Sequence, residues 1–306
     1  MHSTSGHWRL GFFLAFTTAT LWGILPIALK VLLTRMDAMT ITWYRFLFAT
    51  ACIAIYLLIQ TQSRHFLKIT RFITVLLGIA IAGLTSNYIF YLKGLELSDP
   101  NSAQVVIQLA PILLLFGGLI IFRERFNKRQ WLGVFLFTLG IVLFFNPQLR
   151  DLNKLATDYQ FGIILVVLAA ITWAAYALAQ KQLLSYFSSN QIMLCIYVAG
   201  SLLFFPAAVP EQVLLLDKIG WWLLAFCSIN TVMAYGCFAE ALNHLEASRV
   251  SAILAITPLL TIVFMSLISQ DYSEYIHSQS LNQLSLAGAS LMVCGSMLTA
   301  LGKQHK

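Results

Sequence analysis

Charged side chains are scarce in this sequence, which excludes a water-soluble globular protein of ordinary composition. Only 10% of the 306 residues are Asp, Glu, Lys or Arg, whereas 59% are hydrophobic. Soluble domains carry about 25% charged residues, so this chain has too little polar surface for a soluble globule of its size. Lipid is the alternative solvent. The composition therefore predicts a multi-pass protein embedded in a lipid bilayer.

The sequence also lacks the common catalytic and cofactor motifs. It has no Walker A loop, no H-E-x-x-H pair and no G-x-S-x-G turn, so we expect neither direct use of ATP nor enzyme activity. The five cysteines lie in apolar runs without a C-x-x-C spacing, which argues against a zinc or redox site. We expect no cofactor and no metal. The net charge of +7 does not indicate nucleic acid, because the basic residues are grouped between apolar runs as membrane topology requires.

Ten apolar segments are each long enough to be a membrane-spanning helix, which needs about 20 residues. With the N-terminus inside, the cytoplasmic segments would hold twelve Lys and Arg and the outside segments five. The positive-inside rule then places both termini in the cytoplasm, and we expect a bacterial inner (cytoplasmic) membrane. The expected spans are 9–33, 40–60, 72–95, 101–121, 130–146, 160–184, 190–209, 219–243, 249–269 and 283–302.

The two halves of the chain resemble each other in the order of their motifs. A shift of 151 residues places Trp22 on Trp173, and a shift of 147 places Pro111 on Pro258. Each half has five expected helices, so the second half must cross the membrane in the opposite sense. The expected fold is all-α, with ten transmembrane helices in two inverted five-helix repeats, which suits alternating access. The repeats are residues 9–146 and 160–302.

Paired glycines mark the last expected helix of each half. Gly133 aligns with Gly288, and Gly140 aligns with Gly295. Within each helix the two glycines are seven residues apart, so they share one face of that helix. Small residues allow helix backbones to approach closely in a membrane. We therefore expect these glycines to pack helices together.

Several motifs resemble the EamA-type drug/metabolite transporters. They are Trp22-Gly23, Arg45-Phe46 and the segment APILLLFGGLIIFRERFNKRQWLGVFLFTLGIVL at 110–143. The resemblance covers nearly the whole chain, about 9–302. It implies ten spans, both ends in the cytoplasm, and a central cavity lined by spans 1, 3, 4, 6, 8 and 9. It also implies transport of amino acids or related metabolites, mostly outward.

Polar and aromatic side chains inside the expected spans are the candidates for substrate binding. Neutral donors and acceptors can replace the water that a polar substrate loses, and aromatic rings supply contact area. The alternative is that these side chains join helices or fill the core. The candidates are Trp22, Arg45, Asn87, Tyr88, Tyr91, Gln104, Gln108, Trp173, Tyr176, Asn230 and Tyr235.

Arg45 is a charge about five residues inside the second expected span, where an unpaired cation is costly. Its guanidinium either holds a carboxylate or steadies a cavity wall, or it extends to the outer membrane interface.

Glu240 and His244 are one helical turn apart. They are either a proton-carrying pair or an ordinary pair at the inner interface.

The matching prolines, Pro111 and Pro258, remove a backbone hydrogen bond from their helices. They are interpreted as flexing points, with a fixed kink as the alternative.

Taken together, the sequence predicts a secondary transporter that exports a small polar or amphipathic metabolite, as a monomer or homodimer. An importer, a lipid-handling intramembrane enzyme and a membrane partner protein without flux are the alternatives.

Overall fold

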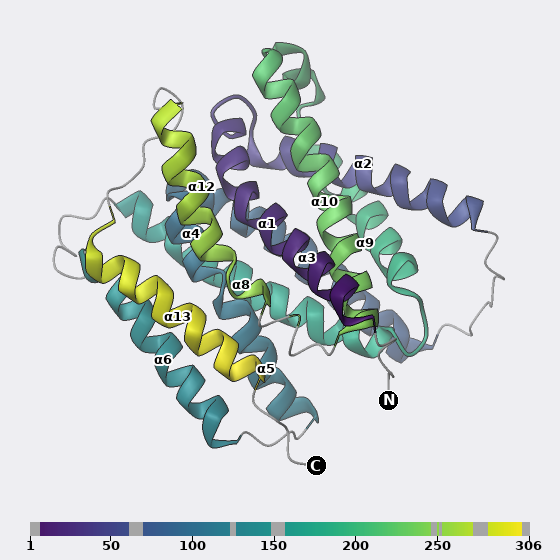
Figure 1. Cartoon of the computed structure of the whole chain (residues 1–306). Helices are drawn as coiled ribbons and strands as arrows, with labels where there is room; N and C mark the ends of the chain where they lie inside the picture. Colours follow the sequence, from purple (N-terminus) through teal and green to yellow (C-terminus); the bar gives the residue numbers. More distant parts are fainter. Residues whose placement is uncertain are drawn as a thin grey trace.

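The structure is a computed structural model of the whole chain, and it is entirely helical over the residues it describes (Figure 1). These residues form eleven α-helices and two short 3-10 helices, without any strand. The predicted all-α class is therefore confirmed for the described part of the chain. That part comprises residues 7–60, 70–122, 127–147, 157–245, 250, 253–271 and 281–301.

The first half of the chain contributes six of the helices. They are α1 (Trp8–Leu32), α2 (Ala38–Ile59), α3 (Arg71–Leu97), α4 (Pro100–Val106), α5 (Leu109–Phe122) and α6 (Lys128–Phe144). The second half contributes five, with two 3-10 helices between the second and third of them. They are α8 (Thr157–Leu183), α9 (Ser189–Phe204), η2 (Phe205–Ala207), η3 (Pro210–Leu215), α10 (Lys218–His244), α12 (Thr257–Asp271) and α13 (Gln283–Leu301).

Polar residues placed just before the helices explain where several of them begin. The carboxylate of Asp217 accepts a hydrogen bond from the backbone N–H of Gly220 at 2.8 Å and caps α10. That N–H and the guanidinium of Arg35 lower the pKa of Asp217. Asn127 and Gln130 form a reciprocal capping box at the start of α6. Such caps satisfy N–H groups that have no partner within the helix.

The expected fourth span is broken, so the prediction of one continuous helix over 101–121 is wrong. A turn at Ile107 and Gln108 separates α4 from α5. Pro111 has no N–H to donate to the carbonyl of Ile107, four residues earlier. That carbonyl instead accepts a hydrogen bond from Ala110 at 2.9 Å.

The expected ninth span is interrupted in the same way. A turn at residues 255–256 precedes α12, close to Pro258. The carbonyl of Leu254, which the missing N–H of the proline would have reached, accepts a hydrogen bond from the hydroxyl of Thr257 at 2.6 Å. Both matching prolines therefore lie at helix breaks. Whether the breaks flex stays a prediction.

Six helices of the described chain are long and apolar enough to cross a membrane. They are Trp8–Leu32, Ala38–Ile59, Arg71–Leu97, Thr157–Leu183, Ser189–Ala207 and Lys218–Phe238. Shorter apolar helices include Thr257–Ser269 and Gln283–Thr299. Large apolar side chains cover the outer faces of the bundle, and Leu58 and Ile59 are 72% and 75% exposed. Apolar surface of this extent is typical of contact with lipid.

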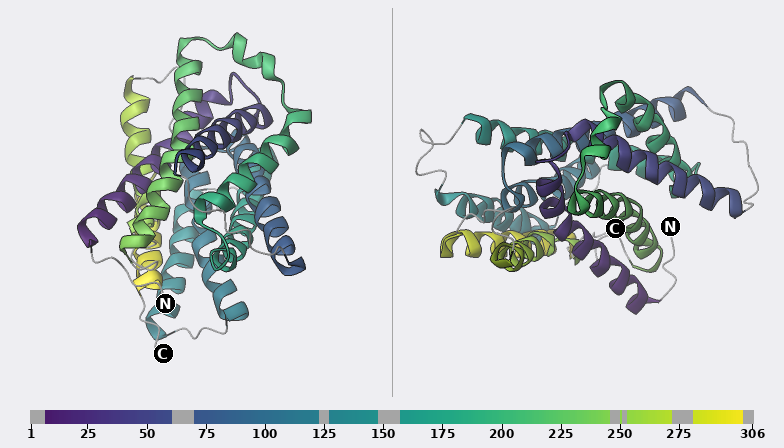
Figure 2. Two further views of the ribbon diagram at one scale, coloured as in Figure 1. Left: turned by 90° about the vertical axis from the view of Figure 1, so that its right-hand side faces the viewer. Right: turned by 90° about the horizontal axis from the view of Figure 1, so that it is seen from above.

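Helices that are far apart in the sequence pack in antiparallel pairs. The pairs are α1 with α10, α2 with α9, α3 with α8 and α6 with α13, and Figure 1 shows α6 and α13 side by side. In the last pair, Gly140 faces Gly288 and Gly133 faces Gly295. The predicted close packing at these glycines is confirmed. The start of α1 and the end of α13 lie toward the same end of the bundle in Figures 1 and 2.

Replacement of Gly140 by alanine is expected to destabilise the pair of helices α6 and α13. The added Cβ would lie 2.6 Å from the backbone nitrogen of Met292 and 2.7 Å from the carbonyl oxygen of Gly288. Overpacking of this kind costs about 1–3 kcal/mol. Thermal unfolding in detergent measures it, with Gly78→Ala as the matched helical control, because a Cβ there meets nothing within 4 Å. Equal unfolding temperatures for the two variants would contradict the expectation.

Candidate substrate site

Arg45 lies inside the helix bundle. The residue is only 3% exposed. Its Nε atom donates to the hydroxyl of Thr231 on α10 at 3.0 Å, and its Cζ atom lies 4.8 Å from the ring centroid of Tyr88 on α3. A guanidinium over an aromatic face is attracted to it. The alternative in which Arg45 extends to the membrane interface is therefore wrong.

Four tyrosines from four different helices lie in the same part of the bundle as this guanidinium, and Tyr88 contacts it directly. Tyr88 is on α3, Tyr176 on α8, Tyr197 on α9 and Tyr235 on α10. Tyr88, Tyr176 and Tyr197 belong to one buried hydrophobic cluster, and Tyr235 packs against it. We call these four residues the tyrosine cluster. Helices of both halves of the chain contribute to it.

Tyr197 is the member of the tyrosine cluster that sequence reasoning missed. It is 1% exposed, and its ring packs edge-on against Phe46, with centroids 5.0 Å apart. Its hydroxyl is buried without a hydrogen-bond partner in the described part of the chain. The available signal was its place in the middle of an apolar helix, the same criterion that selected Tyr176.

The two aligned tryptophans flank the tyrosine cluster from α1 and α8. The Trp22 ring lies 5.5 Å from that of Tyr235, and the Trp173 ring lies 6.3 Å from that of Tyr176. Both tryptophans are only partly buried, although each lies within a long helix. The structure thus brings Trp22, Trp173, Tyr176 and Tyr235 to one region, as the prediction of a shared site requires. Contact with substrate stays a prediction.

The two predicted asparagines hold helices together. The amide of Asn87 on α3 donates to the carbonyl of Ala169 on α8 at 2.9 Å. The amide of Asn230 on α10 donates to the carbonyl of Leu21 on α1 at 2.8 Å. Side-chain amides of this kind strengthen helix contacts in a membrane. The Oδ1 atom of Asn230 is buried without a partner among the described residues.

The three remaining polar candidates lie around the break between α4 and α5. The hydroxyl of Tyr91 donates to the Oε1 atom of Gln104 at 3.1 Å. Gln104 and Gln108 are buried, at 6% and 7% exposure. Gln108 is in the turn itself. These side chains are therefore near the break that Pro111 causes, and their role toward substrate is untested.

Replacement of Asn87 by alanine is expected to lower stability together with transport. The change removes the donor to Ala169, which costs roughly 0.6–2 kcal/mol for an interhelical hydrogen bond in a membrane protein. Gln108→Ala is the matched control, because its amide makes no hydrogen bond to another described residue. The control should lose transport while its unfolding temperature in detergent changes little. An unchanged unfolding temperature for Asn87→Ala would contradict the structural role.

Comparison with known proteins places this architecture in a family. The EamA-like transporter family model matches residues 9–146 and, separately, residues 160–301. The chain belongs to the EamA-like transporter family. It is 37% identical to an uncharacterized transporter of Haemophilus influenzae over 97% of this chain and 96% of that protein. It is 36% identical to an uncharacterized inner membrane transporter of Escherichia coli K12 over 96% and 92% of the two chains.

More distant similarities agree with this family. The chain is 22% identical to a probable amino-acid metabolite efflux pump of Salmonella typhimurium, over 95% of this chain and 94% of that protein. A crystal structure that is 17% identical superposes with a TM-score of 0.64 and covers 98% of this chain and 97% of the other. That likeness shows the fold. The resemblance noted in the sequence is thus confirmed: the protein is a multi-pass membrane transporter of the EamA family.

In this EamA transporter, Glu240 and His244 contact each other on one face of α10. The Nε2 atom of His244 lies 3.1 Å from the Oε1 atom of Glu240. The glutamate side chain is 54% exposed and the histidine side chain 11%. The predicted shared face is confirmed. The exposure of Glu240 agrees with an interfacial pair, and a proton-carrying role stays a prediction.

Lys30 is a second intramembrane cation of this EamA chain, and the sequence did not indicate its role. Its Nζ atom donates to the carbonyl oxygens of Leu95 at 2.8 Å, Glu96 at 2.7 Å and Ser98 at 2.5 Å. These carbonyls belong to the C-terminal end of α3, where the helix itself supplies no donors. A cation there also suits the negative end of the helix dipole. Lys30 therefore ties the end of α1 to the end of α3.

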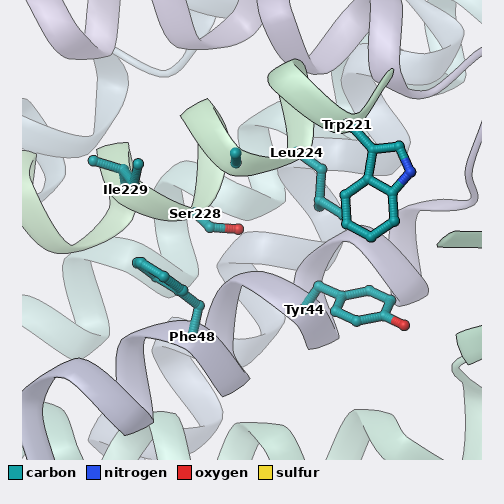
Figure 3. A pocket seen from close by; sticks show the side chains of 7 residues that line it. Tyr44, Phe48, Trp221, Leu224, Ser228 and Ile229 are labelled. Carbon is teal, nitrogen blue, oxygen red and sulfur yellow. The ribbon is translucent and has the colours of Figure 1, made fainter. Parts of the chain in front are cut away.

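A shallow apolar groove opens between α2 and α10 of the transporter (Figure 3). Its volume is about 210 Å³. Figure 3 shows Tyr44 and Phe48 on one wall, facing side chains of α10 on the other. None of the predicted site residues lines this groove. Its walls are Tyr44, Phe48, Trp221, Leu224, Ala225, Ser228 and Ile229.

Proposed function

We propose that this EamA-family protein is a secondary transporter that exports a small amphipathic metabolite, such as an amino acid, across the inner membrane. The observation that carries the proposal is the buried guanidinium of Arg45 among the tyrosine cluster, at a place where both halves of the chain meet. Neutral hydroxyls, amides and aromatic rings suit a substrate with a polar end and an apolar side chain. The names of the Escherichia coli and Salmonella typhimurium relatives support the inner membrane and the outward direction.

The proposed architecture is ten spans in two inverted five-helix repeats, residues 9–146 and 160–302. The two broken segments, α4 with α5 and residues 253–254 with α12, count as one span each. The pairing of helices supports a two-fold relation. In the proposed repeats α1 is equivalent to α8 and α3 is equivalent to α10, so exchanging the halves turns the pair of α1 and α10 into the pair of α8 and α3. Equivalent helices α6 and α13 run antiparallel, as inversion requires. The family model also matches the two halves separately.

Two hydrogen bonds between the halves support the same relation. Asn87 of α3 bonds to the carbonyl of Ala169 on α8, and Thr18 of α1 bonds to the carbonyl of Ala234 on α10 at 3.3 Å. The shifts of 151 and 147 residues align Thr18 with Ala169 and Asn87 with Ala234. The two bonds thus join equivalent positions with donor and acceptor exchanged. Repeats related in this way can exchange roles around a central site, which is the basis of alternating access.

Metabolite efflux from cells tests the proposed activity. Cells with and without the protein are compared by mass spectrometry of the medium and of the cell extract. Export predicts that at least one amphipathic metabolite accumulates inside the cells that lack the protein and is depleted from their medium. Restoration by the wild-type gene is the control. The opposite pattern would identify an importer, and identical metabolite levels would contradict transport.

Cysteine labelling tests the proposed orientation, in which both termini and the 122–130 connection face the cytoplasm. Single cysteines are placed at positions 2, 126 and 305 of a cysteine-free variant, and an impermeant reagent is added to intact cells. We expect no labelling at these positions. Leu214→Cys, in η3 on the opposite side and 78% exposed, is the positive control. Labelling of all three cytoplasmic positions would reverse the topology.

A further inference from the structure

The charge of Arg45 has no counter-charge among the described residues of the protein. Ion pairs in that part of the chain involve other residues, and Arg45 makes none. An arginine cannot release its proton in a protein, so burial cannot neutralise it. A buried cation without an anion is unfavourable unless a partner is supplied. The site therefore lacks one negative charge.

The hydrogen-bonding capacity of the guanidinium is also largely unused. Arginine has five N–H donors in one plane. The Nε donor is bound to Thr231, and one face of the plane lies over Tyr88. The four donors on the two terminal nitrogens have no acceptor among the described residues. The bond at Nε and the contact with Tyr88 hold the plane in position, and neither of them uses the terminal nitrogens.

The neighbouring groups add a second unsatisfied polar atom. The hydroxyl of Tyr197 is buried without a hydrogen-bond partner in the part of the chain that the structure describes, and its ring packs against Phe46, as does the ring of Tyr88 beneath the guanidinium. A hydroxyl can donate to a negatively charged oxygen. The ring of Phe46 packs edge-on against both Tyr88 and Tyr197, and Tyr235 packs against the same cluster, so the environment is largely aromatic. The surroundings therefore offer donors for an anion and apolar walls for the rest of a ligand.

We propose that the terminal nitrogens of Arg45 bind the carboxylate of the transported substrate, with the substrate side chain against the tyrosine cluster. This rests on the proposed transport function and assigns it a substrate class: metabolites with a free carboxylate and an apolar or aromatic portion. The planar edge of a guanidinium matches the two oxygens of a carboxylate. Cationic compounds without an anionic group are excluded by repulsion from Arg45.

Ligand-induced stabilisation of the purified protein tests the proposal without a transport assay. Thermal unfolding in detergent is measured with L-phenylalanine, phenylacetate and acetate, and with the amide counterparts L-phenylalaninamide, phenylacetamide and acetamide. A ligand that binds only the folded state raises the unfolding temperature. We expect at least one carboxylate to raise it by several degrees in wild type and its amide to have no effect. Sodium chloride at equal concentration is the control for an inorganic anion.

Variants locate the effect. Arg45→Gln should lose the carboxylate-dependent shift, Arg45→Lys should retain part of it, and Thr231→Val should weaken it, because Thr231 positions the guanidinium. Arg35→Gln is the matched control, since Arg35 pairs with Asp217 outside the spans, and it should keep the full shift. A shift that survives in Arg45→Gln, equal shifts with acids and amides, no shift with any carboxylate, or an equal shift with chloride alone would each overturn the proposal. If Arg45-dependent binding is found but reconstituted vesicles show no flux, the carboxylate site stands and the transport function fails.

Discussion

Replacement of Arg45 by alanine is expected to reduce transport at low substrate concentration by about 10- to 150-fold. This range corresponds to loss of a hydrogen bond to a charged group, worth about 1.5–3 kcal/mol. The variant should still fold, because the hydroxyl of Thr231 keeps its own bond to the carbonyl of Cys227 at 2.8 Å. The change therefore does not leave the hydroxyl of Thr231 without a partner.

Replacement of Arg45 by lysine distinguishes the contribution of the positive charge from that of the planar guanidinium. Arg45→Lys keeps a cation but loses the planar fork and the Nε bond to Thr231. We expect intermediate transport at normal expression. Initial rates of substrate uptake into inverted membrane vesicles give the measurement, with the amount of inserted protein determined in parallel. Wild-type rates in Arg45→Ala would show that this residue neither binds substrate nor organises the site.

Replacement of Lys30 by methionine is expected to have the largest effect on stability. Methionine keeps an unbranched apolar stem but removes the three hydrogen bonds to Leu95, Glu96 and Ser98. We expect a loss of roughly 2–4 kcal/mol, since charged donors contribute about 1.5–3 kcal/mol each in water-soluble proteins and less between membrane helices. The link between α1 and α3 would be lost, and little folded protein should reach the membrane at elevated temperature.

Lys93→Met is the matched control for Lys30→Met. Lys93 also contacts Glu96, through the glutamate carboxylate at 3.1 Å, but the two side chains are 43% and 39% exposed. Exposed ion pairs contribute about 0–1 kcal/mol, so this variant should unfold close to the wild-type temperature. Thermal unfolding of both variants in detergent makes the comparison. Equal unfolding temperatures for the two variants would show that the three hydrogen bonds of Lys30 contribute no more to stability than the ion pair of Lys93.

The fold and the general place of the site follow from features that the sequence displays directly. Apolar runs define helices, and the spacing of Gly133 and Gly140 indicates the face that packs against α13. Charge scarcity makes Arg45 conspicuous. Its position inside a span left both burial and extension to the interface open, and its contacts with Thr231 and Tyr88 decide for burial. The break at Pro111 was also predictable, because a proline cannot donate to the carbonyl four residues earlier. Pro111 was interpreted as a kink or flexing point within one span over 101–121, and a break was not expected there.

The partners of individual side chains depend on helix rotation and pairing, which the sequence does not display. The amide of Asn87 donates to the backbone carbonyl of Ala169. Every residue has a backbone carbonyl, so the identity of Ala169 does not indicate this contact in the sequence. Lys30 bonds to three such carbonyls. Tyr197 looks like any aromatic residue of an apolar helix until α9 is packed beside α2 and Phe46. These contacts separate helix-joining groups from groups that remain available for substrate.

Flux through the purified protein tests the central claim most directly. The protein is reconstituted into vesicles loaded with a mixture of amino acids and other small carboxylates, and the released compounds are identified by mass spectrometry. We predict release of at least one amphipathic carboxylate that exceeds the release from protein-free vesicles and is lost in Arg45→Gln. Release equal to that of empty vesicles for every compound, from protein shown to be folded and inserted, would contradict the account.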